Sequence, residues 1–302
     1  MKKVLLLFFL IVSGFALANG IDVEAVYSFD EKYNYTIDLG TNDWKSLKTH
    51  QEKVEVSQIP DEILSKLTTT ALLDSILDYP LLIDIYAFNT VDEGYINVFE
   101  SFNGLHEFVE RSNYTNTLAN KYFSLKTEYK NGNIDVFLDM FFCKLLIDGM
   151  NLDIMILSSG DYVYTPNGSS VFVLTRGEEL SWLERLLINY QMDSAYPNAT
   201  RLGMATTNYN CHSYAWYYQS NSNIYWMNNP SAYMSDGSYS ISTPSTGDKV
   251  FYTYADHSGV IYGVNPNNVQ NPVTVTSKWG SCGLYQHYLN DCPYSGSVTV
   301  WD

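Results

Sequence analysis

The stretch that decides the fold is GDKVFYTYADHSGVIYG, residues 247–263, in which a polar turn joins two short runs of β-branched and aromatic residues. Gly and Asp bound these runs, which is typical of neighbouring strands. A third such run, PVTVTSKW (residues 272–279), follows an Asn-rich linker. The three runs predict a small antiparallel sheet with His257 at the start of its second strand.

Cys211 lies upstream of this predicted sheet, in NYNCHSYAWYY (residues 208–218), a run that can open a helix. A helix followed by strands, rather than alternating units, predicts an α+β domain. A helix N-terminus activates a thiol, and a neighbouring imidazole can take its proton. Because the helix and the sheet pack together, we expect His257 to face Cys211. Ser277 or Lys278, at the end of the next strand, is then placed to orient the ring.

Each candidate also has a simpler explanation. Cys211 could be a buried or disulfide-bonded residue, and His257 could simply end a strand. His212 follows Cys211 directly and would point about 100° away from it on a helix, so structural and substrate-facing roles are both open. His287 is an alternative third member of the site. A Cys-His zinc site is disfavoured because the sequence lacks a supporting Cys-x-x-Cys or His-x-x-x-His pair, and we expect no cofactor.

Two further residues are candidates for binding substrate. Asn210 could assist an oxyanion hole, although capping the helix start is the simpler role. Trp226 lies in the insertion before the predicted sheet and could line a substrate groove, although aromatic packing would also explain it.

The N-terminus predicts export. Two lysines, an apolar run at residues 4–12 and Ala16-Leu17-Ala18 are the parts of a secretory signal peptide covering residues 1–18. The apolar run is too short to cross a bilayer, which takes about 20 residues, so a membrane anchor is the less favoured alternative. We therefore expect a secreted mature chain that begins near Asn19 and meets conditions in which disulfides form.

The four cysteines divide by their surroundings. Cys282 and Cys292 lie ten positions apart in SCGLYQHYLNDCPY and could close a disulfide, which would stabilise the fold by about 2 to 3 kcal/mol. Cys143, in DMFFCKLLI, has the surroundings of a small buried hydrophobic residue. If both interpretations hold, Cys211 has no partner and is a candidate reactive thiol.

Composition predicts two domains with a boundary near residues 197–200. The formal net charge is −16, and most of it belongs to residues 19–199, with acidic residues spread over predicted helix faces. Residues 200–302 contain no glutamate and half of the tyrosines. We expect the acidic region to be a pro-segment, a cap or a substrate-positioning domain. Strong acidity argues against a nucleic-acid partner, because phosphate binding needs clustered Lys and Arg.

Apolar residues at helical spacing predict that the acidic region is mainly helical. The predicted helices are IPDEILSKL (59–67), TTALLDSILDYP (69–80), YINVFESFNGLHEFVER (95–111), IDVFLDMFFCKLLIDG (134–149) and EELSWLERLLINYQ (178–191). Between the last two, YTPNGSSVFVLTRG (164–177) predicts a turn and a strand.

A family resemblance appears at the Cys and His motifs. GDKVFYTYADHSGVIYG, downstream of Cys211, resembles the strands of the NlpC/P60 and CHAP branches of the papain-like fold, which are secreted bacterial cysteine peptidases and amidases that commonly act on cell-wall peptides. The resemblance covers roughly residues 200–290. The pattern YNCHSYAWYY…HSGVIY…TSKWG…DCPY is also similar to a group of secreted bacterial proteins without an assigned activity.

The resemblance implies that Cys211 is the nucleophile and His257 the base. The chain departs from the NlpC/P60 pattern in two places. Those enzymes usually have Asp-Cys-Ser-Gly around the nucleophile, where this chain has Asn-Cys-His-Ser. Their third polar residue is typically His, Asn or Gln, where this chain has Ser277 and Lys278.

The sequence thus predicts an α+β protein: a mainly helical N-terminal domain followed by a papain-like domain (residues 200–302) with a helix packed on a small antiparallel sheet. The predicted activity is that of a secreted cysteine hydrolase, which cleaves an amide or peptide bond in a peptide, protein or peptidoglycan-peptide substrate. An acyl-enzyme on Cys211 would be resolved by water, with His257 as base and then acid. The alternatives are an exported binding module on an inactive papain-like fold, and a thiol acyltransferase.

Overall fold

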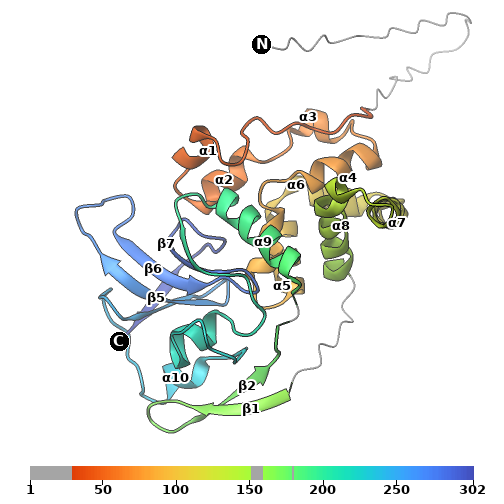
Figure 1. Cartoon of the computed structure of the whole chain (residues 1–302). Coiled ribbons are helices and arrows are strands. Elements are labelled where there is room, and N and C mark those ends of the chain that lie inside the picture. The colour runs from red at the N-terminus through yellow and green to blue at the C-terminus, as the bar shows by residue number, and fades with distance from the viewer. Residues whose placement is uncertain (1–28, 151–158, 179) are drawn as a thin grey trace, which may run out of the picture.

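The computed structural model describes residues 29–150, 159–178 and 180–302 (Figure 1). The predicted signal peptide and the predicted start of the mature chain lie outside these residues. Helices dominate the first half of the chain and antiparallel strands the C-terminal part, so the chain is α+β, as predicted. Within the described ranges, no helix is both long and apolar enough to cross a membrane.

Short helices build the region before residue 200. They are α1 (Asn42–Ser46), α2 (His50–Val56), α3 (Asp61–Leu64), α4 (Thr69–Leu77), the 3-10 helix η1 (Leu82–Ala87), α5 (Val91–Ser101), α6 (Asn103–Glu110), α7 (Tyr114–Lys130), the 3-10 turn η2 (Ile134–Val136), α8 (Phe137–Met150) and α9 (Trp182–Ala195).

Side-chain caps fix where several of these helices begin. Thr49 and Ser181 form reciprocal capping boxes with Glu52 and Glu184 at the starts of α2 and α9. Such caps are each worth roughly 0.5 to 2 kcal/mol because they satisfy backbone N–H groups that the helix leaves unpaired.

The predicted helix over residues 95–111 is instead two helices, α5 and α6. Phe102 interrupts it with an extended backbone (φ −120°, ψ 112°). The Phe102 ring stacks on Tyr79 with centroids 3.8 Å apart, and it also lies over Gly104, where an added Cβ would come within 2.4 Å of the ring. The break therefore buries Phe102, and Gly104 leaves room for it.

Strands form two sheets in the described part of the chain. A hairpin pairs β1 (Ser159–Tyr164) with β2 (Ser170–Thr175), and a main sheet of six strands has the order β3-β7-β6-β5-β4-β8, antiparallel throughout. The members of the main sheet are β3 (Thr200–Gly203), β4 (Lys249–Tyr252), β5 (His257–Val264), β6 (Val273–Lys278), β7 (Leu284–Tyr288) and β8 (Val298–Trp301). The three predicted strands are confirmed as β4, β5 and β6, and the sheet is larger than predicted.

The two faces of the main sheet are covered by different elements. On one face, Val260 packs with Trp216 of the π-helical turn η3 (Ser213–Tyr217), near the short helix α10 (Ser231–Ser235). On the other face, Ile261 and Val275 belong to a hydrophobic cluster that extends into the N-terminal helices. In Figure 1, α9 lies between those helices and the sheet. The helices and the sheet therefore share one buried core.

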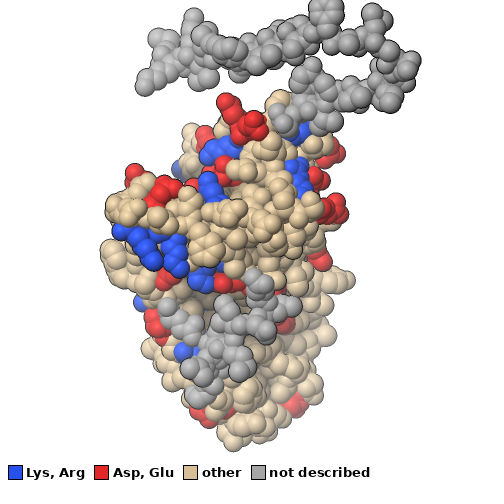
Figure 2. All heavy atoms as spheres, turned by 90° about the vertical axis from the view of Figure 1, so that its right-hand side faces the viewer, with Lys and Arg blue, Asp and Glu red and all other residues tan. Residues whose placement is uncertain are grey.

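The charged side chains are distributed as expected for solvated helix faces. Figure 2 shows the side of the molecule that lies on the right in Figure 1, and acidic and basic residues are interspersed over its helical part. Lys121 of α7, for example, pairs with Asp74 of α4 at 2.8 Å, with both side chains partly exposed.

The predicted disulfide between Cys282 and Cys292 is wrong: in the part of the chain that is described, both thiols are free and buried. The reason is β7, which lies between them. Its five residues run as an extended strand, and each thiol is buried in surroundings of its own. The Cys292 thiol instead lies 3.4 Å from the carbonyl oxygen of Leu289. Cys143 is buried in α8, as predicted.

Candidate active site

Cys211 starts the helical segment that packs on the main sheet. One α-helical step at Cys211 and His212 leads into the π-helical turn η3, so a helix is present where the sequence predicted one. π-Helical turns are rare and are frequent at functional sites. The Cys211 side chain is 1% exposed. Its position as the first residue of a helix matches the expectation. Because the thiol is buried, its reactivity depends on the groups that surround it.

Asn210 holds the start of this segment in place. Its Oδ1 accepts from the backbone N–H groups of Ser213 at 3.2 Å and Met227 at 3.1 Å. Its Nδ2 donates to the Met227 carbonyl at 2.7 Å and to Asn89 Oδ1 at 2.9 Å. Both ends of the amide are thus engaged with the protein, which supports the capping role; its substrate-binding role stays a prediction.

Asn89, between η1 and α5, is the residue that sequence reasoning missed. Its Oδ1 accepts from Asn210 and lies 3.6 Å from Cys211 Sγ. Its Nδ2 donates to the Asp256 carbonyl at 3.1 Å and lies 3.3 Å from His212 Nε2. Backbone groups of Ser213 and Met227 fix the orientation of the Asn210 amide. Because Asn210 Nδ2 donates to Asn89 Oδ1, the Asn89 amide is oriented with its oxygen toward Cys211. The helical region therefore contributes directly to the surroundings of Cys211.

His212 is fully buried in the same network. Its Nδ1 lies 2.8 Å from Ser258 Oγ, which also accepts from Trp216 Nε1, and its Nε2 lies 3.5 Å from the Asp256 carboxylate. Burial opposes the charged imidazolium, but the interactions with Cys211 and with the Asp256 carboxylate outweigh burial and raise the pKa of His212 to about 10. His212, whose role the sequence left open, is thus the imidazole held beside the thiol.

His257 lies on the opposite face of β5 from Ser258, because successive strand residues alternate. Its ring stacks on Tyr294 with centroids 3.5 Å apart. Among the described residues, its buried Nε2 has no hydrogen-bond partner, and no hydrogen bond joins it to Cys211. Burial, helped by the charges of His287 and His212, lowers the pKa of His257 well below its usual value. His257 is thus a neutral imidazole with an unused nitrogen, and its role as base stays a prediction.

The candidates for the third site residue have other partners. His287 Nδ1 donates to the Tyr288 carbonyl at 2.8 Å, so the Ser277 hydroxyl donates to His287 Nε2, also at 2.8 Å. Ser277 Oγ accepts from Trp279 as well, so its one proton is committed to His287. Lys278 is buried, with its ammonium donating to the Thr206 and Gly280 carbonyls, and burial lowers its pKa to about 7.

Trp226 is packed rather than open to a groove. Its side chain is 1% exposed, and the Arg176 guanidinium lies 4.2 Å from the centre of a ring. Its backbone pairs with Leu174 of β2, which joins the hairpin to this part of the chain. Its substrate-binding role stays a prediction.

No family model, curated protein or solved structure matches this chain. The resemblance to NlpC/P60 and CHAP proteins therefore stays a prediction, and the chemistry has to be argued from the site itself.

Proposed function

We propose that this protein is a secreted thiol hydrolase in which Cys211 attacks an amide or peptide carbonyl. The observation that carries the proposal is the setting of this thiol. Cys211 begins a helical segment beside a charged imidazole, whereas Cys143 lies within α8 and Cys282 and Cys292 lie in loops. Burial raises the pKa of the thiols of Cys143 and Cys292 to about 12.

The architecture supports a papain-like arrangement. A helical segment that starts with a cysteine packs on an antiparallel sheet, and a strand headed by a histidine follows it in the chain. Both the thiol and that histidine are buried, with 1% of each residue exposed.

In this proposal His212 and His257 have different roles. His212 carries a positive charge that stabilises the sulfur as it loses its proton. The proton passes to Nε2 of His257, the sulfur attacks the carbonyl carbon, and His257 then protonates the leaving amine. In the second half of the reaction, His257 takes a proton from water and the hydroxide attacks the acyl carbon. The Cys211 sulfur then leaves and takes the proton back from His257.

Two movements are required for this chemistry. The His257 ring has to turn from Tyr294 toward the thiol, and Asn89 has to leave Cys211 so that a substrate can reach the sulfur. Asn89 belongs to the acidic helical region, which thereby acts as a cap on the site. The substrate class that we propose is a peptide, including peptides of the cell wall.

Turnover by variants tests the proposal. Peptidoglycan peptides and unfolded proteins are incubated with the wild-type chain, and products are followed by mass spectrometry. We expect cleavage that Cys211→Ser abolishes and that His257→Asn lowers by roughly 100-fold or more, the range for loss of a general base. Cleavage that survives in Cys211→Ser would contradict the proposal.

One observation favours a second candidate, a non-enzymatic binding module. The groups around Cys211 are engaged with one another, and the thiol is covered. If the wild-type chain binds peptides but cleaves none of them, this second candidate is the better description.

A further inference from the structure

A second buried polar cluster lies in the helical region, away from Cys211. It surrounds a pocket of about 70 Å³ between α2, η1, α5 and the segment that follows Cys292. Polar and aromatic side chains share its lining, among them His50, Tyr79, Asp84, Phe88 and Asn97. Cys211, His212 and His257 do not contribute to this lining, so the pocket is separate from the candidate active site.

Among the described residues, two polar atoms of the lining have no hydrogen-bond partner. Asp84 is 2% exposed, and its Oδ2 accepts from the Tyr196 hydroxyl at 2.6 Å. Its Oδ1 and the Tyr79 hydroxyl are buried and have no hydrogen-bond partner in the described ranges. A buried carboxylate oxygen without a donor is costly, so a donor that arrives from outside would be favoured.

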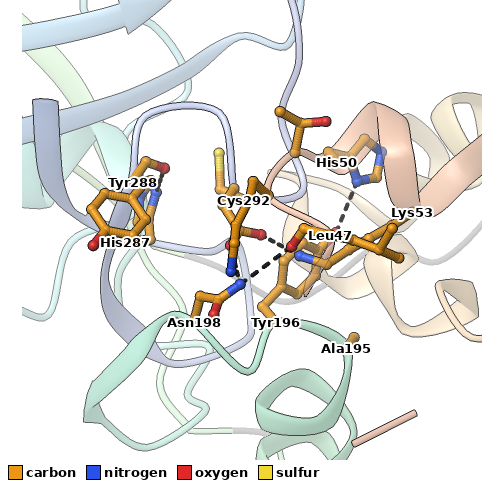
Figure 3. Close-up of polar contacts among 12 residues, drawn as sticks. Leu47, His50, Lys53, Ala195, Tyr196, Asn198, His287, Tyr288 and Cys292 are labelled. Atoms are coloured by element: carbon orange, nitrogen blue, oxygen red, sulfur yellow. Dashed lines mark hydrogen bonds and ion pairs between the residues drawn. The ribbon is translucent and has the colours of Figure 1, made fainter. Parts of the chain in front are cut away.

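The neighbours of Asp84 show which charge the pocket accepts. The Tyr196 proton goes to Asp84, so His50 Nδ1 carries a proton and donates to the Tyr196 oxygen at 3.0 Å. Burial, with the charge of Lys53, lowers the pKa of His50 to about 4, so its ring is neutral. Lys53 is paired with Asp291, and its ammonium lies 4.6 Å from the centre of the Tyr196 ring, beside which Figure 3 shows it. The lining thus presents acceptors and one acidic group.

We propose that this pocket binds a small primary ammonium group, held by the Asp84 carboxylate and the Tyr79 hydroxyl. An ammonium has three N–H donors and one positive charge, which matches the unused acceptors and the single acid. A volume of about 70 Å³ is small, which favours a compact head group. The proposal is independent of the chemistry at Cys211.

The ionisation of Asp84 should make ammonium binding depend on pH. Burial raises the pKa of Asp84 to about 7, although the Tyr196 hydrogen bond and Lys53 oppose the rise. Ammonium binding favours the ionised carboxylate, so affinity should increase as the pH rises from 6 to 8, where an alkylammonium stays charged.

Methylammonium chloride added to the full chain tests the site, with sodium chloride at equal ionic strength as reference. We expect a saturable rise in Tm above that in sodium chloride, larger at pH 8 than at pH 6. Asp84→Asn should weaken the apparent affinity at least tenfold and remove the pH dependence. Tyr79→Phe should weaken the apparent affinity several-fold and keep its pH dependence. This variant still tests the site if Asp84→Asn does not fold.

The exposed Tyr190→Phe is the matched control and should bind as the wild type does. Equal Tm values in the two salts for the wild-type chain would overturn the proposal. So would a crystal structure grown with methylammonium that shows only water molecules against Asp84 and Tyr79.

Discussion

The surroundings of Cys211 and the pocket at Asp84 are both built where the helical region meets the C-terminal part of the chain, and they differ in how completely their polar groups are paired. Around Cys211, the amides of Asn89 and Asn210 bind each other, the backbone and the thiol. At Asp84, one carboxylate oxygen and the Tyr79 hydroxyl are unpaired within the described residues. The first arrangement covers a reactive group and has to open, whereas the second can accept a ligand as it stands.

The largest effect that we expect concerns the buried ion pair behind the Asp84 pocket. Lys53 and Asp291 are both buried and paired with each other. Lys53→Met leaves Asp291 as an unpaired buried charge and should lower the free energy of unfolding by about 3 to 5 kcal/mol. Denaturant unfolding measures this.

The matched control is Lys144→Met, which removes the partly exposed pair with Asp148 and should cost less than about 1 kcal/mol. Equal losses in the two variants would show that the Lys53 pair does not hold the two parts of the chain together.

The two regions should also respond to pH in opposite senses. The pKa of His212 is raised to about 10, so its contribution to stability is complete below about pH 6.5 and is lost as the pH rises toward 10. The pKa of His50 is lowered to about 4, so the contribution of its neutral ring is lost as the pH falls from about 6.5 toward 4.

Unfolding free energies of the wild type, His212→Gln and His50→Gln, measured across this range, check the two signs. The destabilisation by His212→Gln should shrink toward high pH, and that by His50→Gln should shrink toward low pH. If the destabilisation changed with pH in the same direction for both variants, the proposed electrostatic difference between the two regions would be contradicted.

Asn89→Ala should break the cover over Cys211. The change removes the acceptor of Asn210 Nδ2 and should cost about 1 to 3 kcal/mol, because it leaves a buried donor unpaired. It should also increase the rate at which Cys211 is alkylated, measured by mass spectrometry under folding conditions. The exposed Asn267→Ala is the control and should change neither quantity. An unchanged alkylation rate in Asn89→Ala would mean that the helical region does not cap the thiol.

The smallest effect distinguishes the paired tyrosine from the unpaired one. Tyr196→Phe removes the hydroxyl that joins His50 to Asp84 and should cost about 1 to 3 kcal/mol. Tyr79→Phe removes a hydroxyl that has no partner among the described residues, so it should leave stability unchanged or raise it. Thermal unfolding without ligand compares the two. A large loss in Tyr79→Phe would indicate that its hydroxyl is already satisfied by ordered water.

Sequence patterns predicted those helices and strands that are determined by their own residues. Apolar spacing predicted α4 and α9, and β-branched runs predicted β4, β5 and β6. The strand β7 was missed because LYQHY contains no β-branched residue, and the disulfide prediction failed because spacing along the chain does not show that a strand lies between the two cysteines.

The site was predictable only in part. Cys211 at a helix start followed from the sequence, but the direction in which His257 points depends on strand alternation and on which layer covers each face. Asn89 carried no signal, since it reaches Cys211 only through the packing of the helical region on the sheet.

The most direct test of the central claim is the reactivity of Cys211 compared with the other three thiols. The folded wild-type chain is treated with limiting iodoacetamide, and the modification of each cysteine is followed over time by mass spectrometry. We expect Cys211 to be modified well before Cys143, Cys282 and Cys292, and His212→Gln to slow its modification. Equal or slower reaction of Cys211 in the wild-type chain would contradict its role as a nucleophile.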